Sequence, residues 1–133
     1  FGMGACTNSA YATQYNLPGT FAPVADFETL RKAVNVAEKL GVKPFIGNVF
    51  SSDTFYDDSF PSANWGKVGC LAVEMEAAAL YMNAARAGKR GLCICTISDS
   101  LVTHEVTTAE ERQNTFTQMM EIALDTAVEM AKK

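Results

Sequence analysis

Apolar residues follow two patterns along this chain, one typical of helices and one typical of buried strands. Between residues 26 and 40 they recur every three or four positions, which predicts a helix with one apolar face. That face consists of Phe27, Leu30, Val34, Ala37 and Leu40. Asp26 is placed to cap the first turn of this helix, and Gly41 is placed to end it.

Two further helices are predicted in the second half of the chain. The first is the alanine-rich stretch 75–87, which is closed by Gly88. The second begins near Thr108, because Thr108 and Glu111 have the spacing of a capping box, and it runs to the end.

Three stretches are interpreted as strands, namely 42–50, 68–73 and 92–97, and the chain also opens in what looks like a strand. The last two stretches are continuously apolar, as in strands buried on both faces. Residues 51–66 are rich in Ser, Asp and Pro and are interpreted as a loop. Helices alternating with such strands predict an α/β fold with a mostly parallel sheet. In such folds, ligands gather at the carboxyl ends of the strands.

Composition narrows the class of protein. The chain has 133 residues, 48% of them hydrophobic and 20% charged, and fits one globular domain. Its net charge is −4 and its basic residues do not cluster, so no nucleic-acid partner is expected. No apolar run approaches the ~20 residues of a membrane span, so no membrane association is expected. The missing initiator Met suggests part of a longer polypeptide.

The four cysteines give no sign of a metal site. They form no C-x-x-C pair, and no His lies at a spacing that would complete a zinc site. Cys93 and Cys95 are two apart in an apolar run and point to one face. We interpret all four as buried, reduced thiols of a cytoplasmic protein.

Two carboxylates follow the 68–73 strand directly. Glu74 and Glu76 are two residues apart, so in an extended chain they point to the same side. Such a pair of acceptors suits a cis-diol, for example the 2′ and 3′ hydroxyls of a ribose. The alternative is that both are favourably placed at a helix N-terminus and have no further function.

A second group of polar residues follows the 92–97 strand. Asp99 leaves this strand at the expected mouth of the sheet, where partial burial would raise its pKa and let it act as an acid. Arg112 follows after a loop and could return to pair with Asp99. The alternatives are a turn-capping Asp and a solvated Arg. His104 stands in the same loop and is interpreted as a packing or surface residue.

Five segments together resemble the hexameric purine nucleoside phosphorylases. They are GMGACTNS (2–9), GNVFSSDTFY (47–56), VEMEAA (73–78), CTISD (95–99) and THEVTTAEERQ (103–113). The resemblance runs from Gly2 nearly to the end, with the motifs in the family's order. It implies a three-layer α/β fold with a central mixed, mostly parallel sheet flanked by helices. Residues 1–133 would be the C-terminal portion of a single such domain.

The resemblance also implies an activity and a site. Purine (deoxy)ribonucleosides would be cleaved by phosphate to free purine and (deoxy)ribose 1-phosphate in purine salvage, with no cofactor and no metal. Asp99 would be the proton donor and Arg112 its helper. The residues implied to bind the nucleoside are Phe55, Val73, Glu74, Met75, Glu76, Ser98 and Asp99. Phosphate-binding residues would lie in an upstream half, and the subunits would form a hexamer built as a trimer of dimers.

One departure from the family and two alternatives remain. Ser100, Leu101 and Val102 follow Asp99 where many relatives have a His and then a basic residue. The first alternative is a hydrolytic nucleosidase for thioether adenosines, although the 103–113 segment favours the phosphorylases. The second is a fragment without catalytic activity.

Overall fold

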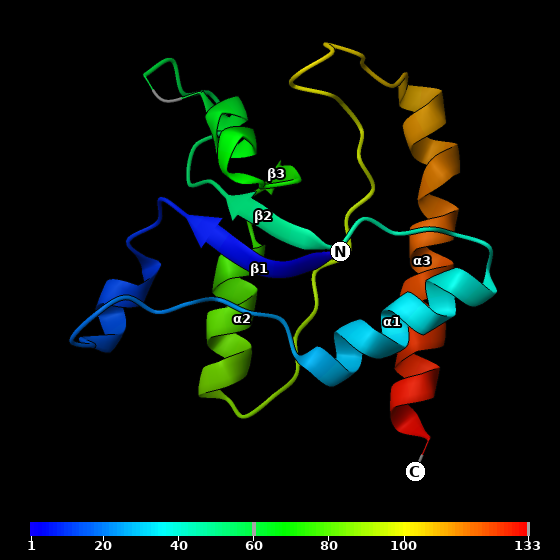
Figure 1. Cartoon of the computed structure of the whole chain (residues 1–133), viewed down its shortest axis with the longest axis horizontal. Helices are drawn as coiled ribbons and strands as arrows, with labels where there is room; N and C mark the ends of the chain where they lie inside the picture. The colour runs from blue at the N-terminus through cyan, green and yellow to red at the C-terminus, as the bar shows by residue number, and fades with distance from the viewer. Residues whose placement is uncertain (60, 133) are drawn as a thin grey trace.

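Parallel strands form the centre of the structure, a computed structural model that describes residues 1–59 and 61–132 (Figure 1). β1 (Gly2–Thr7), β2 (Gly47–Ser51) and β3 (Ala72–Glu74) lie in that order across the sheet. At its end, Ser51 pairs with Thr7 on one side and with Glu74 on the other. The carboxyl ends of these strands therefore meet at one edge of the sheet.

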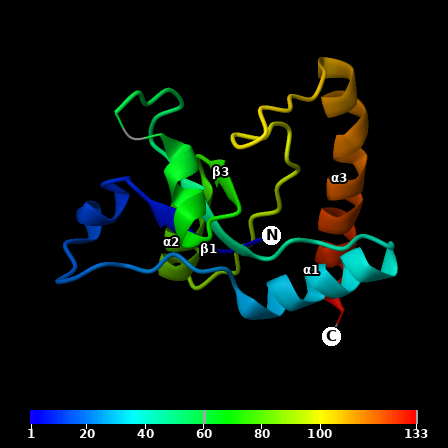
Figure 2. The same ribbon diagram turned by 45° about the horizontal axis from the view of Figure 1, so that its top comes forward.

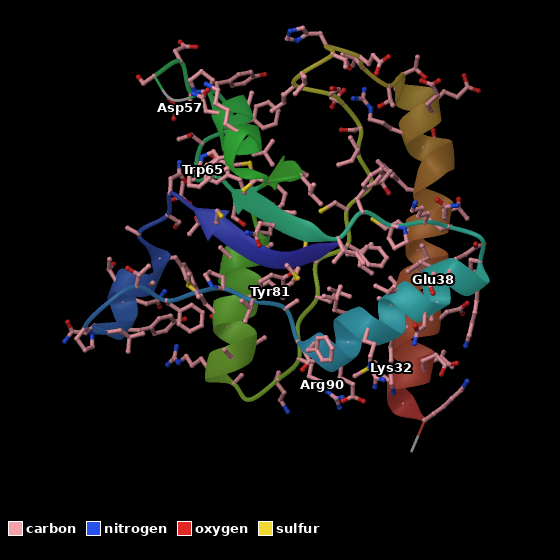
Figure 3. All side chains as sticks on the ribbon, in the orientation of Figure 1. Lys32, Glu38, Asp57, Trp65, Tyr81 and Arg90 are labelled. Atoms are coloured by element: carbon pink, nitrogen blue, oxygen red, sulfur yellow. The ribbon has the colours of Figure 1, made fainter. Side chains whose placement is uncertain are left out.

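Helices flank this sheet on different sides. α2 (Ala77–Arg86) follows β3 and packs on β1 and β2, with Tyr81 beside β1 (Figure 3). α1 (Phe27–Lys39) and α3 (Ala109–Ala131) pack against each other to one side of the sheet, as Figures 1 and 2 show. Two 3-10 helices, η1 (Tyr11–Tyr15) and η2 (Ser62–Val68), lie in the connections. The α/β prediction is confirmed, and the sheet pairings are parallel.

The predicted starts of the first and last helices are confirmed by their caps. Asp26 Oδ1 accepts a hydrogen bond from Thr29 N at 2.8 Å and closes the first turn of α1. Thr108 Oγ1 accepts from Glu111 N at 3.1 Å, while the Glu111 carboxylate accepts from Thr108 N at 2.8 Å. This reciprocal pair is the capping box expected at the start of α3.

The apolar face predicted for the first helix is only partly buried. Leu30 and Ala37 lie in the core, but Phe27 is 76% exposed and Leu40 43% exposed. The buried residues of α1 are instead Leu30, Ala33, Val36 and Ala37, so the face that packs in the core is partly displaced from the predicted one.

The predicted strand 92–97 is wrong. Within the described residues, this segment meets β1 through one antiparallel bridge, between Gly2 and Cys93. The edge of β1 beyond Gly2 is already taken, because Ala5 N donates to Pro23 O and Ala25 N donates to Met3 O. An apolar run can be extended and half-buried, but it forms a strand only where a neighbour offers free backbone groups.

The other strands differ from their predicted bounds. β2 begins at Gly47 rather than at 42, after a stretch in which Pro44 lacks an amide donor. β3 begins at Ala72 because η2 runs to Val68 and Gly69 then takes a left-handed conformation with φ +87°. The stretch interpreted as the loop 51–66 therefore contains the end of β2 and the start of η2.

No helix in the part of the chain that the structure describes combines the length and the apolarity needed to cross a membrane.

Candidate active site

A cavity of about 530 Å³ opens beside β3 at the carboxyl edge of the sheet. Residues of η2 and β3 line one side, residues 95–102 line another, and Phe116 and Met119 of α3 line a third. Its volume lies within the roughly 300–1,000 Å³ of small-molecule sites. Of the residues implied to bind the nucleoside, those in the lining are Phe55, Val73, Glu74, Ser98 and Asp99. Met75, Glu76 and Arg112 are outside the lining.

Aromatic rings lie along the η2 side of this cavity. Trp65 stacks on Phe50 with ring centroids 4.4 Å apart, next to the end of β2 (Figure 3). Phe55 is 77% exposed and packs edge-on against Tyr56. The ring of Phe55 is thus accessible from the cavity, where a flat base could stack on it.

Glu74 is held by the first turn of α2. Its Oε2 accepts hydrogen bonds from Glu76 N at 2.8 Å and Ala77 N at 2.6 Å. Its Oε1 accepts a hydrogen bond from the Ser51 hydroxyl, which in turn accepts one from Ala78 N at 2.9 Å. The placement at a helix N-terminus, which the spacing left open, is therefore present for Glu74, whose Oε2 accepts from the amides that begin α2 while its Oε1 accepts from Ser51.

Glu76 has a different environment, although it stands only two residues away. Its side chain is exposed, and its Oε2 accepts a hydrogen bond from Met75 N at 3.1 Å. Met75 is 42% exposed. The two carboxylates do not share one set of partners, because the chain turns into α2 between them.

The loop between Asp99 and α3 folds back on itself and returns Arg112 to Asp99. Thr107 N and Oγ1 both donate to Ser98 O, at 3.0 and 2.5 Å, and Ser100 N donates to Glu105 O. Arg112 Nη1 lies 4.0 Å from Asp99 Oδ1, and both side chains are about 40% exposed. The expected pairing is therefore present as a long, solvent-accessible ion pair, which is weak in this state.

A second polar neighbour of Asp99 is the residue directly before it. Ser98 Oγ donates to Asp99 Oδ2 at 2.7 Å. His104 stands at the turn with φ +58°, and its amide donates to Ser100 O. His104 thus has the loop position that the sequence indicated, away from the cavity lining.

Two thiols face the same cavity. Cys95 lies with its Sγ 3.4 Å from that of Cys93, and a hydrogen bond from the Cys93 thiol lowers the pKa of Cys95 to about 7. The Sγ atoms of Cys70 and Cys6 are 3.7 Å apart, and burial raises the pKa of Cys70 to about 11. Among the described residues, no three His, Cys, Asp or Glu side chains gather as metal ligands would.

Comparison with known proteins identifies the family. A sequence model of the phosphorylase superfamily matches residues 3–132, nearly the whole chain. The chain belongs to the phosphorylase superfamily. The parallel sheet flanked by helices, with a cavity at its carboxyl edge, agrees with this assignment.

Several bacterial relatives of this superfamily member carry the name purine nucleoside phosphorylase DeoD-type. The protein of Clostridium beijerinckii is 56% identical over 108 residues, which cover 80% of this chain and 46% of that protein. The protein of Tolumonas auensis is 50% identical over 128 residues, covering 96% and 54%. The protein of Clostridium novyi is 48% identical over 126 residues, covering 94% and 54%. The chain thus spans about half the length of these relatives.

Sequence reasoning missed Ser51, a buried polar residue of this superfamily chain. Ser51 is 4% exposed and connects the ends of β2 and β3 to α2. A signal existed, because Ser51 directly follows the apolar pair Val49 and Phe50 at a strand's carboxyl end. It was hidden in a stretch of Ser and Asp that also has the composition of a loop.

Proposed function

We propose that this chain forms the nucleoside-binding part of a purine nucleoside phosphorylase. The enzyme would cleave purine (deoxy)ribonucleosides with phosphate to free base and (deoxy)ribose 1-phosphate. The observation that carries the proposal is the 48–56% identity to proteins of that name over 80–96% of this chain. The cavity between β3 and residues 95–102 supports it, since it brings Glu74, Ser98 and Asp99 to one site.

In the proposed reaction, phosphate attacks C1′ while the bond from C1′ to N9 of the purine breaks. Asp99 donates a proton to N7, so the base leaves neutral, and a positioned acid of this kind contributes about 10²–10⁴-fold. Arg112 then closes its 4.0 Å separation and stabilises the carboxylate that remains.

The sugar is held next to the cavity, by residues that directly follow β3 and lie outside the lining. Glu76 accepts hydrogen bonds from the ribose hydroxyls and keeps C1′ in line with the attacking phosphate. Met75 packs against the sugar, and the exposed ring of Phe55 stacks on the base. Phosphate is a co-substrate, and in this proposal its ligands come from outside residues 1–133.

The polypeptide and its assembly are part of the same proposal. Residues 1–133 would be the C-terminal portion of a domain with an upstream half, assembled as a trimer of dimers in the cytoplasm. The relatives' greater length supports the upstream half, because this chain covers 46–54% of them. The resemblance of the five sequence segments supports the hexamer.

Phosphate dependence tests the function. The natural-length polypeptide that carries this chain is incubated with inosine or adenosine, with and without phosphate, and the sugar product is identified. Ribose 1-phosphate formed only with phosphate is the expected result. Free ribose formed without phosphate would instead indicate a hydrolytic nucleosidase, and no cleavage at all would indicate a non-catalytic protein. Residues 1–133 alone are expected to be inactive, because the phosphate site is not among them.

A further inference from the structure

A buried serine joins the two strand ends beside the proposed ribose site. Ser51 ends β2 and is 4% exposed. Its hydroxyl donates to Glu74 Oε1 and accepts from Ala78 N at 2.9 Å. A hydroxyl has one proton to donate and two lone pairs that accept. Ser51 therefore uses its proton and one of its lone pairs in hydrogen bonds within the protein.

Glu74 is committed to the same network. It accepts hydrogen bonds from Ser51, from Glu76 N at 2.8 Å and from Ala77 N at 2.6 Å. An ionised carboxylate accepts about four hydrogen bonds, so most of its capacity is used before any ligand binds. The amides involved begin α2, and the first amides of a helix have no acceptor within the helix itself. Releasing Glu74 to bind a ligand would leave these amides without a partner.

The backbone of Glu76 is held in place, whereas its exposed carboxylate accepts one hydrogen bond, from Met75 N at 3.1 Å. Its amide is fixed by Glu74, and its φ of −129° and ψ of −31° place it outside the helix that follows. Upstream, Ser52 N donates to Glu74 O at 2.8 Å, so the chain is also anchored where it leaves β3. The exposed carboxylate of Glu76 therefore projects from a backbone fixed on both sides.

We propose that Ser51 and Glu74 are positioning residues for Glu76. They hold the backbone of Met75 and Glu76 so that Glu76, and not Glu74, binds the ribose hydroxyls. This assignment rests on the proposed function, since it takes a purine nucleoside as the ligand. It gives different roles to two carboxylates that their spacing alone treats as equivalent.

A double-mutant cycle on kcat/KM for inosine tests this division of roles in the natural-length polypeptide. Glu76→Ala and Glu74→Ala are each expected to lose about tenfold or more, as expected for loss of a charged hydrogen bond. The double variant should lose no more than Glu76→Ala, because Glu74 acts through Glu76. Glu74→Gln should recover most of the loss of Glu74→Ala, since an amide oxygen still accepts from the helix. Multiplied losses in the double variant would overturn the proposal.

Substrates without the hydroxyls separate positioning from general damage. Ser51→Ala should lose about tenfold with inosine, but under about twofold with 2′,3′-dideoxyinosine, which offers Glu76 nothing to bind. Ser52→Ala is the matched control, because Ser52 is equally buried at 3% exposure and its hydroxyl bonds to the backbone of Thr54, two residues along the chain. Equal losses with both substrates would show that Ser51 is merely structural.

Amide hydrogen exchange keeps the two proposals distinguishable. The amides of Ala77 and Ala78 should exchange at least tenfold faster in Glu74→Ala and Ser51→Ala, respectively, than in Ser52→Ala. Unchanged exchange would overturn the positioning role whatever the activity. A further outcome is that the unsubstituted polypeptide cleaves no nucleoside while amide exchange in the variants changes as expected. In that case the proposed function and the ribose assignment of Glu76 both fail, but the hydrogen bonds of Ser51 and Glu74 to the start of α2 are supported. Should Ser51→Ala not fold, Glu74→Gln and Glu74→Ala provide the same comparison.

Discussion

Replacing Tyr81 by Phe removes a hydroxyl that connects three parts of the fold. Tyr81 lies on α2 and is 1% exposed. Its hydroxyl donates to Gly2 O of β1 and accepts from Cys93 N at 3.0 Å. Burial raises the pKa of Tyr81 to about 12, so the hydroxyl remains a donor at physiological pH. The Tyr81→Phe substitution deletes both hydrogen bonds and retains the ring that fills the core.

The structure sets the size of the expected effect. An intramolecular hydrogen bond contributes about 0.5–1.5 kcal/mol, and a buried donor left without a partner costs about 1–3 kcal/mol. The part-buried amide of Cys93 loses its partner, so Tyr81→Phe should lower the free energy of unfolding by about 1–3 kcal/mol. Tyr11→Phe is the control, because its hydroxyl bonds Asn83 at 2.8 Å at an exposed site, and it should cost less than about 1 kcal/mol.

Two measurements on the natural-length polypeptide check this prediction. Urea unfolding at a fixed protein concentration gives the change in free energy of unfolding for both variants. Hydrogen exchange at the Cys93 amide should accelerate in Tyr81→Phe and stay unchanged in Tyr11→Phe. A loss below about 0.5 kcal/mol with unchanged exchange at Cys93 would refute the bridging role assigned to the hydroxyl.

Three further predictions concern chemistry and pH. Asp99→Asn should reduce adenosine cleavage far more than inosine cleavage, because an amide can donate to N7 and O6 of a 6-oxo purine but cannot transfer a proton. Asp26→Ala should cost about 1 kcal/mol at pH 7. The Thr29 hydrogen bonds lower the pKa of Asp26, so this contribution is present above the unfolded pKa and is lost as pH falls through the folded pKa. Iodoacetamide should alkylate Cys95 before the other thiols, with a rate that rises through pH about 7, because the Cys93 thiol stabilises its thiolate.

Each of these has a result that would contradict it. Equal losses for adenosine and inosine would show that Asp99 is not the acid that distinguishes them. A stability difference between Asp26→Ala and the parent that persists unchanged in acid would exclude an ionised cap. Alkylation of Cys95 with the pH dependence of an ordinary thiol would contradict the effect of its neighbour, and Cys93→Ala provides the control.

The sequence by itself determined the features that depend on neighbours along the chain. The first turns of α1 and α3 begin where Asp26 and Thr108 predicted, because a cap needs only residues three positions away. The carboxyl end of β3 was also predicted, since Glu74 follows a short apolar run. The family resemblance implied seven nucleoside-binding residues, of which Phe55, Val73, Glu74, Ser98 and Asp99 line one cavity, whereas Met75 and Glu76 lie outside its lining.

Only the tertiary structure decided what depends on partners distant in sequence. Residues 92–97 failed to form a strand because residues 23–25 occupy the edge of β1, which no local pattern reveals. Glu74 and Glu76 share a spacing but not an environment, because Ser51 approaches Glu74 from a different strand. Hydrophobic periodicity along the sequence predicts which residues are buried. The hydrogen-bond partner of a buried polar group, however, can come from any part of the chain, so only the complete fold determines it.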